Sequence, residues 1–287
     1  MSQPLLQYRE QAPPADLAGW VEAFWFIETL APTGEQAQHW VLPEASLNLV
    51  FWVPRGWQYA TQMVPPILSG PTMKSFRKAA VPGEAYIGVR FRAGAGPAFV
   101  GCPGGKLTSL IQPLHLLLPD WSQRLAGRLR AVHSEADALT VITEELRGRA
   151  TELPPADALM LDAAAWLRRQ KDPVTLQQWS SECGLSERQF RRRFLDAVGL
   201  SPKAYMRIER LQAFVREHLL KEDIHWGMIS YQAGFADQAH LVNDFRSLSG
   251  DRPTRFHRHL QNIDHTELLE DSPTDGRKVQ YPPGQAR

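Results

Sequence analysis

Arginine and glutamine side chains line one face of a helix that the sequence predicts from about residue 187 to residue 198. At about 100° per residue, Phe190, Phe194 and Val198 fall together on the opposite face, which we expect to meet a core. Arginine pairs bidentately with guanine and glutamine with adenine in the DNA major groove, so the polar face suits base recognition. A charged face that meets only solvent is the alternative, and this helix alone does not decide between them. The candidate DNA-contacting residues are Arg188, Gln189, Arg191 and Arg192.

Two capping boxes and a glycine place this helix in a larger unit. Thr175-Leu-Gln-Gln178 has a pattern that opens a helix, and Ser186-Glu-Arg-Gln189 repeats it a few residues later. Gly184, between them, supplies the backbone freedom for a tight exit from the first helix. A short helix, a glycine turn and a second capped helix are typical of the helix-turn-helix motif.

A second copy of this pattern follows about 50 residues further on. In this copy, Met228 and Ile229 belong to the predicted first helix, and Gly234 follows them at the turn. Asp237 is placed to cap a second helix that runs to about Ser249. Leu241, Phe245 and Leu248 form its predicted buried stripe, and the outward positions carry Ala239, His240 and Asn243. Each copy closes on a glycine and then a proline: Gly199 and Pro202, then Gly250 and Pro253.

A single long helix is predicted between the two copies. Ser201 and Pro202 are a cap and first-turn pair that opens it, and the pattern continues to about Leu220. Some 20 residues at about 1.5 Å each give about 30 Å. One turn of B-DNA measures about 34 Å, so this length suits two recognition helices in successive major grooves.

Four stretches carry a family resemblance: Leu185-Ser186-Glu187-Arg188-Gln189-Phe190-Arg191-Arg192-Arg193-Phe194, Gly199-Leu200-Ser201-Pro202, Gly234-Phe235-Ala236-Asp237-Gln238-Ala239-His240-Leu241 with Phe245-Arg246, and Gly250-Asp251-Arg252-Pro253. In order and spacing, the segment from about Asp157 to Leu260 resembles the DNA-binding module of the AraC/XylS family of bacterial transcription regulators. The resemblance implies base contacts from the first part of each recognition helix. The implied residues are Arg188, Gln189, Arg191 and Arg192, then Gln238, Ala239, Val242 and Asn243.

The second unit departs from the family pattern. Ala239 and Val242 cannot donate hydrogen bonds, and Asn243 replaces a frequent arginine. Ser180 and Ser230 stand where the family usually carries alanine. We therefore expect the second unit to recognise its site through thymine methyl groups, Gln238 and Asn243, or mostly to contact the DNA backbone. Arg246 and the helix N-termini are expected on phosphates.

The N-terminal part has a different texture. Short apolar runs broken by proline and glycine, such as Leu47–Val53 and Tyr86–Phe91, predict strands of a mostly antiparallel barrel or sandwich up to about residue 112. Residues from about 113 to 150 predict two amphipathic helices, which either cover their own sheet or form a homodimer interface. The segment resembles a companion domain found before such modules, which implies sensing or dimerisation. The family pattern usually reads Pro-Asp-Gly where Pro43, Glu44 and Ala45 stand here.

The predicted architecture is therefore α+β in two domains. Residues 1–150 form a sensor or dimerisation domain, 151–156 a linker, 157–260 the double helix-turn-helix domain, and 261–287 a disordered tail. The expected function is sequence-specific, double-stranded DNA binding by a transcription regulator, modulated through the first domain by a small-molecule effector or by a protein partner. Five tryptophans either line an effector pocket or fill the sheet core: Trp20, Trp25, Trp40, Trp52 and Trp57.

Composition narrows the remaining classes. The net charge of +1 gives no indication of a nucleic-acid partner. Two isolated cysteines, no secretion signal and no apolar run of about 18 residues predict a cytoplasmic protein with no membrane segment. No cofactor, metal or catalytic residue is predicted. An N-terminal metal- or thiol-dependent enzyme targeted to DNA is the alternative, with His39 near Glu44 and Cys102 as its weak candidates.

Overall fold

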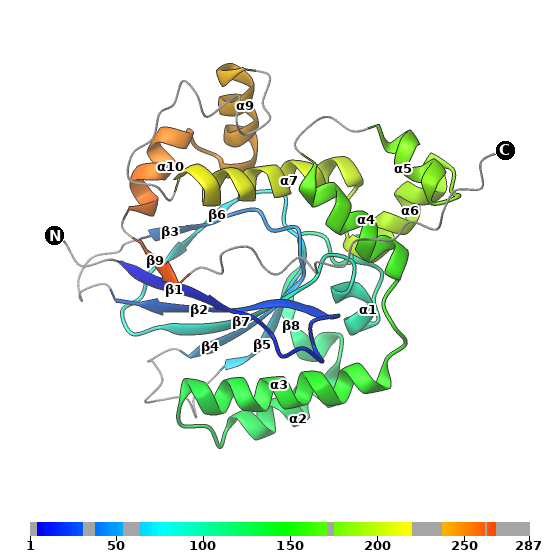
Figure 1. Ribbon diagram of the computed structural model, residues 1–287. Helices are drawn as coiled ribbons and strands as arrows, with labels where there is room; N and C mark the ends of the chain where they lie inside the picture. The colour runs from blue at the N-terminus through cyan, green and yellow to red at the C-terminus, as the bar shows by residue number, and fades with distance from the viewer. Residues whose placement is uncertain are drawn as a thin grey trace.

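The computed structural model describes residues 5–30, 38–53, 64–170, 175–219, 237–261 and 263–267. The first half of the chain supplies all but one strand of a seven-stranded sheet in the order β8-β5-β4-β7-β2-β1-β9, whose edge strand β9 comes from near the C-terminus (Figure 1). A separate two-stranded ribbon pairs β3 with β6. All neighbours in both sheets are antiparallel except β1 and β9, which are parallel. The strands are β1 (Leu6–Gln11), β2 (Val21–Thr29), β3 (Gln38–Val41), β4 (Asn48–Val53), β5 (Val64–Ser69), β6 (Phe76–Ala79), β7 (Ala85–Phe91), β8 (Ile111–Pro113) and β9 (Ile263–Glu267). The predicted antiparallel, β-rich first domain is confirmed.

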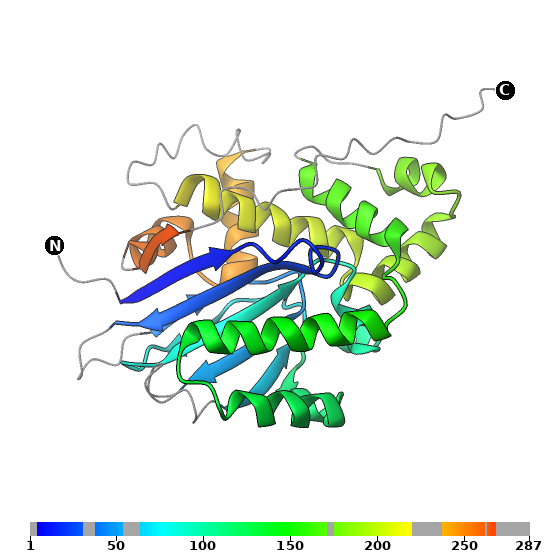
Figure 2. The ribbon, with the colours of Figure 1, turned by 60° about the horizontal axis from the view of Figure 1, so that its bottom comes forward.

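Helices α2 (Pro119–Leu129) and α3 (Glu135–Glu152) cover one face of the large sheet (Figure 2). Their apolar stripes join Phe24, Phe51 and Phe91 of the strands in one buried core. The two predicted amphipathic helices therefore cover their own sheet, and this use occupies the stripe that a dimer interface would need. The helix residues of this core are Trp121, Leu125, Leu129, Ala138, Ile142 and Leu146.

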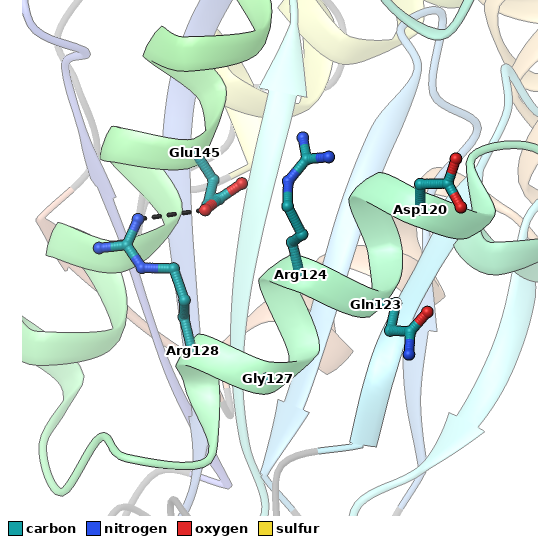
Figure 3. A pocket seen from close by; sticks show the side chains of 6 residues that line it. All are labelled: Asp120, Gln123, Arg124, Gly127, Arg128 and Glu145. Carbon is teal, nitrogen blue, oxygen red and sulfur yellow. Dashed lines mark hydrogen bonds and ion pairs between the residues drawn. The ribbon is translucent and has the colours of Figure 1, made fainter.

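A hollow of about 570 Å³ opens on the outer side of α2 and α3 (Figure 3). Its lining is charged and polar, and Arg128 lies 3.1 Å from Glu145 across it. The lining residues are Asp120, Gln123, Arg124, Gly127, Arg128 and Glu145. None of the lining residues is aromatic or aliphatic, so no large apolar side chain is placed there to hold a hydrophobic effector.

The opposite face of the large sheet carries aromatic side chains. Trp52 of β4 stacks on Tyr86 of β7 with ring centroids 6.4 Å apart. Trp25 of β2 donates to Asn48 at 2.9 Å, and its ring lies so close to the backbone of Gly88 that an added Cβ would fall 1.7 Å away. Trp25 and Trp52 are half-buried and lie outside the helix-covered core, so filling that core does not explain them.

The other tryptophans have different surroundings. Trp20 packs against the helix-covered core, and Trp40 packs against a core in the C-terminal half. Trp57 lies outside the described residues.

Helices form the second half of the chain. Their bounds are α4 (Ala158–Arg169), α5 (Leu176–Glu182), α6 (Glu187–Val198), α7 (Pro202–Phe214), α9 (Gln238–Ser249) and α10 (Pro253–Leu260), with a π-helical turn at Val215–Leu219. The short helix α1 (Gly96–Val100) and the 3-10 turns η2 (Gly104–Lys106) and η3 (Leu114–Leu116) belong to the first half. None of the helices in the described ranges is both long enough and apolar enough to span a bilayer.

The join between the halves is close to the predicted linker. Helix α3 ends at Glu152 and Asp157 caps α4, so the connection is only a few residues long. The predicted domain bounds otherwise stay predictions. The predicted disordered tail is wrong for Ile263–Glu267, because this segment pairs with the free edge of β1 as strand β9. Residues 268–287 lie outside the described residues.

His39 gives the first testable prediction. This β3 side chain is only 6% exposed, and burial, together with Lys78 and His259, lowers its pKa from 6.5 to about 4. The unfolded chain therefore binds one more proton than the folded chain between those values, so stability falls as the pH drops through this window. We expect a loss of about 1.4 kcal/mol per pH unit, up to about 3 kcal/mol.

Urea denaturation at several pH values between 4 and 7 measures this loss. His39→Gln should flatten the pH dependence, whereas His133→Gln, at an exposed position, should leave it unchanged. An equally steep profile for His39→Gln would contradict the assignment to this side chain.

Candidate DNA-binding surface

Helix α6 begins at a complete capping box. Ser186 Oγ accepts from the Gln189 backbone N–H at 3.3 Å, and Gln189 Oε1 accepts from the Ser186 N–H at 2.9 Å. The helix ends at Gly199, whose φ of +92° is the left-handed conformation that glycine adopts without strain. The bounds predicted for this helix are confirmed. The preceding α5 begins after Thr175 as predicted, but the side chain of Gln178 lies outside the description, so that capping box stays a prediction.

The two faces of α6 separate as predicted. Phe190, Phe194 and Val198 are buried in a core with Tyr205 and Ile208 of α7. All four candidate residues are exposed: Arg188, Gln189, Arg191 and Arg192. The structure therefore presents an arginine-rich, solvent-facing surface on the first half of this helix.

The arginines on this helix have different partners. Arg191 pairs with Glu187 at 3.0 Å, one turn back on an exposed surface. Arg193 forms a two-pronged pair with Asp157, at 2.5 and 2.8 Å, and Asp157 also caps α4. Within the described part of the chain, Arg188 and Arg192 have no ion pair. These two guanidinium groups are therefore the ones most available to an external anion or base edge.

Gln189 has a structural role in addition to the base contact predicted for it. Its Oε1 atom accepts from both the backbone N–H and the hydroxyl of Ser186, at 2.9 and 2.8 Å. Bidentate pairing with adenine needs the oxygen and the nitrogen of the amide together. Gln189 must therefore leave its capping box before it can make that contact.

Helix α9 repeats this construction. Asp237 caps it by accepting from the His240 N–H at 2.7 Å, and Gly250 ends it with φ of +79°. Leu241, Phe245 and Leu248 form its buried stripe, as predicted. The exposed residues are Gln238, Ala239, His240, Asn243 and Arg246, and Val242 is half-buried. The predicted first helix of this unit, with Met228, Ile229, Ser230, Gly234 and Phe235, lies outside the described residues.

Helix α7 is a common support for both units (Figure 1). Ser201 caps it by accepting from the Ala204 N–H at 3.2 Å. Tyr205 and Ile208 contact the first unit, whereas Leu211 and Phe214 contact the core around α9 and α10. With the π-helical turn, the helical segment from Pro202 to Leu219 measures about 27 Å at about 1.5 Å per residue. The predicted long helix between the repeats is confirmed.

A buried ion cluster joins this helical half to the sheet. Arg168 of α4 contacts Glu22 of β2 at 2.7 Å and Glu209 of α7 at 2.6 Å. Both carboxylates are at least nine-tenths buried. Burial alone would raise the pKa of Glu22, but Arg168 and Arg90 outweigh it and hold that pKa below its usual range. Sequence analysis missed Arg168, because one charged residue at a helix end carries no signal of a distant partner.

A second arginine extends the cluster within the sheet domain. Arg90 of β7 contacts Glu10 at 2.8 Å and Glu44 at 3.3 Å. Burial raises the pKa of Glu44, Arg90 opposes the shift, and Glu209 and Glu22 add to it. Glu44 is thus coupled electrostatically to carboxylates of both halves of the molecule.

The described residues give no support to metal chemistry. They contain no group of three or more His, Cys, Asp or Glu side chains arranged to hold a metal ion. His39 and Glu44, the weak candidates from the sequence, have other surroundings: His39 lies beside Lys78 and His259, and Glu44 lies beside Arg90.

Two segments of the chain match known protein families. Residues 9–111 match the family described as "Domain of unknown function (DUF6597)", and residues 179–259 match the family described as "Helix-turn-helix domain". No curated protein matches the chain.

Several solved structures match the chain over all or part of its length. A variant of apo ToxT from Vibrio cholerae has a TM-score of 0.45 and 10% identity, covering 87% of this chain and 100% of that chain. Wild-type ToxT from the same organism with bound unsaturated fatty acid has a TM-score of 0.39 and 11% identity, covering 92% and 100%. The DNA-binding domain of AdpA, a global transcriptional factor in complex with a target DNA, has a TM-score of 0.33 and 21% identity, covering 37% and 95%.

The helix-turn-helix match includes both capped helices, α6 and α9. Together with the repeated caps and the shared support helix, it defines the class of the protein as a helix-turn-helix DNA-binding protein. Residues 179–259 therefore form a helix-turn-helix domain, and a β-rich domain precedes it in the chain.

Proposed function

We propose that the protein binds one face of double-stranded DNA, with the first halves of α6 and α9 in two successive major grooves. The main support is the pair of capped helices with exposed polar faces on one common helix. Their support helix is about 27 Å long, close to the pitch of about 34 Å that separates successive grooves. A single chain then does what a helix-turn-helix dimer does with two.

The two helices contribute differently to this binding. Arg188 and Arg192 contact base edges, with guanine as the preferred base, and Arg191 lies on the flank of the same helix. Gln189 contributes when it leaves its cap. On α9, Gln238, Ala239, His240 and Asn243 meet the DNA with less charge, and Arg246 contacts phosphate.

Selection of bound sites from random DNA by the full chain tests this proposal. We expect an enriched site with two unlike half-sites centred about 10 base pairs apart, and a guanine in the half-site read by α6. A single short motif would contradict the use of two grooves. Absence of any enriched sequence would contradict sequence-specific binding.

We also infer that the N-terminal domain responds to a small molecule on the aromatic face of its sheet. The support is the half-buried Trp25 and Trp52, together with the stacking of Trp52 on Tyr86 on the same face. Aromatic walls with a few polar atoms are the usual lining of ligand sites. A homodimer through α2 and α3 stays a prediction without structural support.

Tryptophan fluorescence with a panel of aromatic acids, amines and neutral aromatics tests this site. A saturable change that Trp52→Leu abolishes would support it. A saturable change that persists in Trp52→Leu would place the ligand elsewhere, and no change with any compound would contradict binding of an aromatic effector.

A further inference from the structure

One short loop of the sheet domain touches the ends of both recognition helices. This loop, Pro71–Ser75, connects β5 to β6, and we name it the crosspiece. Pro71 lies against the C-terminal glycine of α6, where a Cβ added to Gly199 would come within 3.1 Å of the proline ring. Four residues later, the Ser75 N–H donates to the carbonyl of Leu248, in the last turn of α9, at 2.9 Å.

The contact at α6 is a close approach of two backbones. A Cβ on Gly104 of η2 would lie 2.4 Å from the Gly199 nitrogen and 2.8 Å from its Cα. The Thr108 hydroxyl donates to the Gly199 carbonyl, and the Ser109 N–H donates to the Pro71 carbonyl at 2.7 Å. The end of α6 is therefore enclosed by η2, the following loop and the crosspiece, with no room for an extra methyl group at Gly104.

The contact at α9 has a second component. The ring of Trp40 in β3 lies 3.8 Å from the Cβ position of Gly250, which ends α9. The backbone N–H of Trp40 also donates to Nε2 of His259 in α10 at 3.2 Å. The second unit therefore contacts the β3–β6 ribbon through Trp40, next to the hydrogen bond that Ser75 makes.

The crosspiece is itself attached to the support helix. Thr72 and Glu44 exchange backbone hydrogen bonds, with N–H to carbonyl distances of 2.8 and 3.2 Å. The neighbouring Pro43 carbonyl accepts from Nε2 of Gln212, in the last turn of α7, at 2.6 Å. Besides the Arg168 cluster, the sheet domain therefore contacts the DNA-binding domain at the end of α6, the last turn of α7 and the end of α9.

We propose that the crosspiece fixes the relative placement of the two recognition helices, so that the N-terminal domain helps to set the half-site spacing that the protein accepts. This inference rests on the proposed two-groove binding. The four Cα–Cα steps from Pro71 to Ser75 reach at most about 14 Å, so the loop can hold the two helix ends only within a narrow range. Because each helix is rigid, a shift of its C-terminal end moves the N-terminal half that meets the bases.

Two adjacent glycines provide a matched test in the full chain. Gly104→Ala must push the end of α6 away, since its methyl group would meet backbone atoms of Gly199. Gly105→Ala adds the same group at 3.5 Å from the Leu195 side chain, an ordinary contact, and serves as the control. Affinities are measured on the site selected by the wild-type protein and on versions with one base pair added or removed between the half-sites.

We expect the wild-type protein and Gly105→Ala to prefer the selected spacing by at least about tenfold, the effect of about 1.4 kcal/mol. For Gly104→Ala, we expect the preference for the selected spacing to fall from about tenfold to about threefold or less, or the preferred spacing to change. A folded Gly104→Ala protein with the wild-type spacing preference would overturn the proposal. Failure of the wild-type protein to select any two-part site would instead overturn the proposed function.

A second variant covers the case in which Gly104→Ala does not fold. One glycine inserted between Met73 and Lys74, both exposed, lengthens the crosspiece without entering a core. It should relax the spacing preference while leaving binding to the isolated α6 half-site within about twofold of wild type. Unchanged spacing preference in this variant would also overturn the proposal.

Discussion

Arg168→Met is expected to lower the free energy of unfolding by about 3 kcal/mol, the cost of removing one partner from a buried ion pair. Arg168 contacts Glu22 at 2.7 Å and Glu209 at 2.6 Å, and neither carboxylate can reach water freely. Its Nη2 atom also lies 3.3 Å from the second oxygen of Glu22. Methionine keeps much of the side-chain volume but leaves these carboxylates buried without their shared cation.

Urea denaturation at pH 7 measures this loss. Arg169→Met, the next residue and an exposed one, is the matched control and should change stability by less than about 0.5 kcal/mol. The double variant Arg168→Met, Glu22→Gln should recover part of the loss, because it removes one of the two stranded charges. A loss below about 1 kcal/mol for Arg168→Met would show that the pair behaves like a surface ion pair.

The ion cluster of Arg168, Glu22 and Glu209 lies at the contact between the two domains. Glu22 belongs to the sheet domain, whereas Arg168 and Glu209 belong to the helical domain, so the pair stabilises the contact between them. Glu44, coupled electrostatically to both Glu22 and Glu209, also exchanges backbone bonds with Thr72 of the crosspiece. A change on the sheet face near Arg90 therefore has a continuous set of contacts to the ends of both recognition helices.

Local signals explain why the recognition helices were predicted well. The caps at Ser186 and Asp237 and the glycines at 199 and 250 act within a few residues of the chain, and all four have the predicted role. The periodic apolar positions likewise identified the buried faces, because a helix of fixed pitch converts spacing into direction.

Contacts between distant segments were not predictable in the same way. Strand β9 forms because β1 offers a free edge, and nothing in its own five residues indicates that partner. The attachment of Arg193 to Asp157 and the use of Gln189 in its own cap both depend on side-chain directions that residue type and spacing leave open. Sequence therefore identified the exposed face of α6 but not which of its side chains are already engaged.

Arg192→Ala is expected to weaken binding to the selected site by about 1–3 kcal/mol, or roughly 5- to 150-fold. The loss should be concentrated at one base pair, because Arg192 is exposed on the outward face of α6 and has no ion pair among the described residues. Binding to every single-base variant of the site, with wild-type and substituted protein, locates that base pair. There, Arg192→Ala should bind all four bases with similar affinity.

Arg191→Ala and Arg193→Ala separate this role from two others on the same helix. Because Arg191 lies on the flank, Arg191→Ala should lower the affinity for all DNA sequences equally and should reduce the salt dependence of binding, as expected when a phosphate contact is lost. Because Arg193 is ion-paired with Asp157, Arg193→Ala should lower the stability of the protein without changing its base preference. If Arg192→Ala instead weakens all sequences equally, it is a phosphate contact, and if it changes nothing, the outward face of α6 does not meet DNA. The pairing of Arg193 with the cap of α4 and the exposure of Arg192 thus make neighbouring arginines distinguishable by experiment.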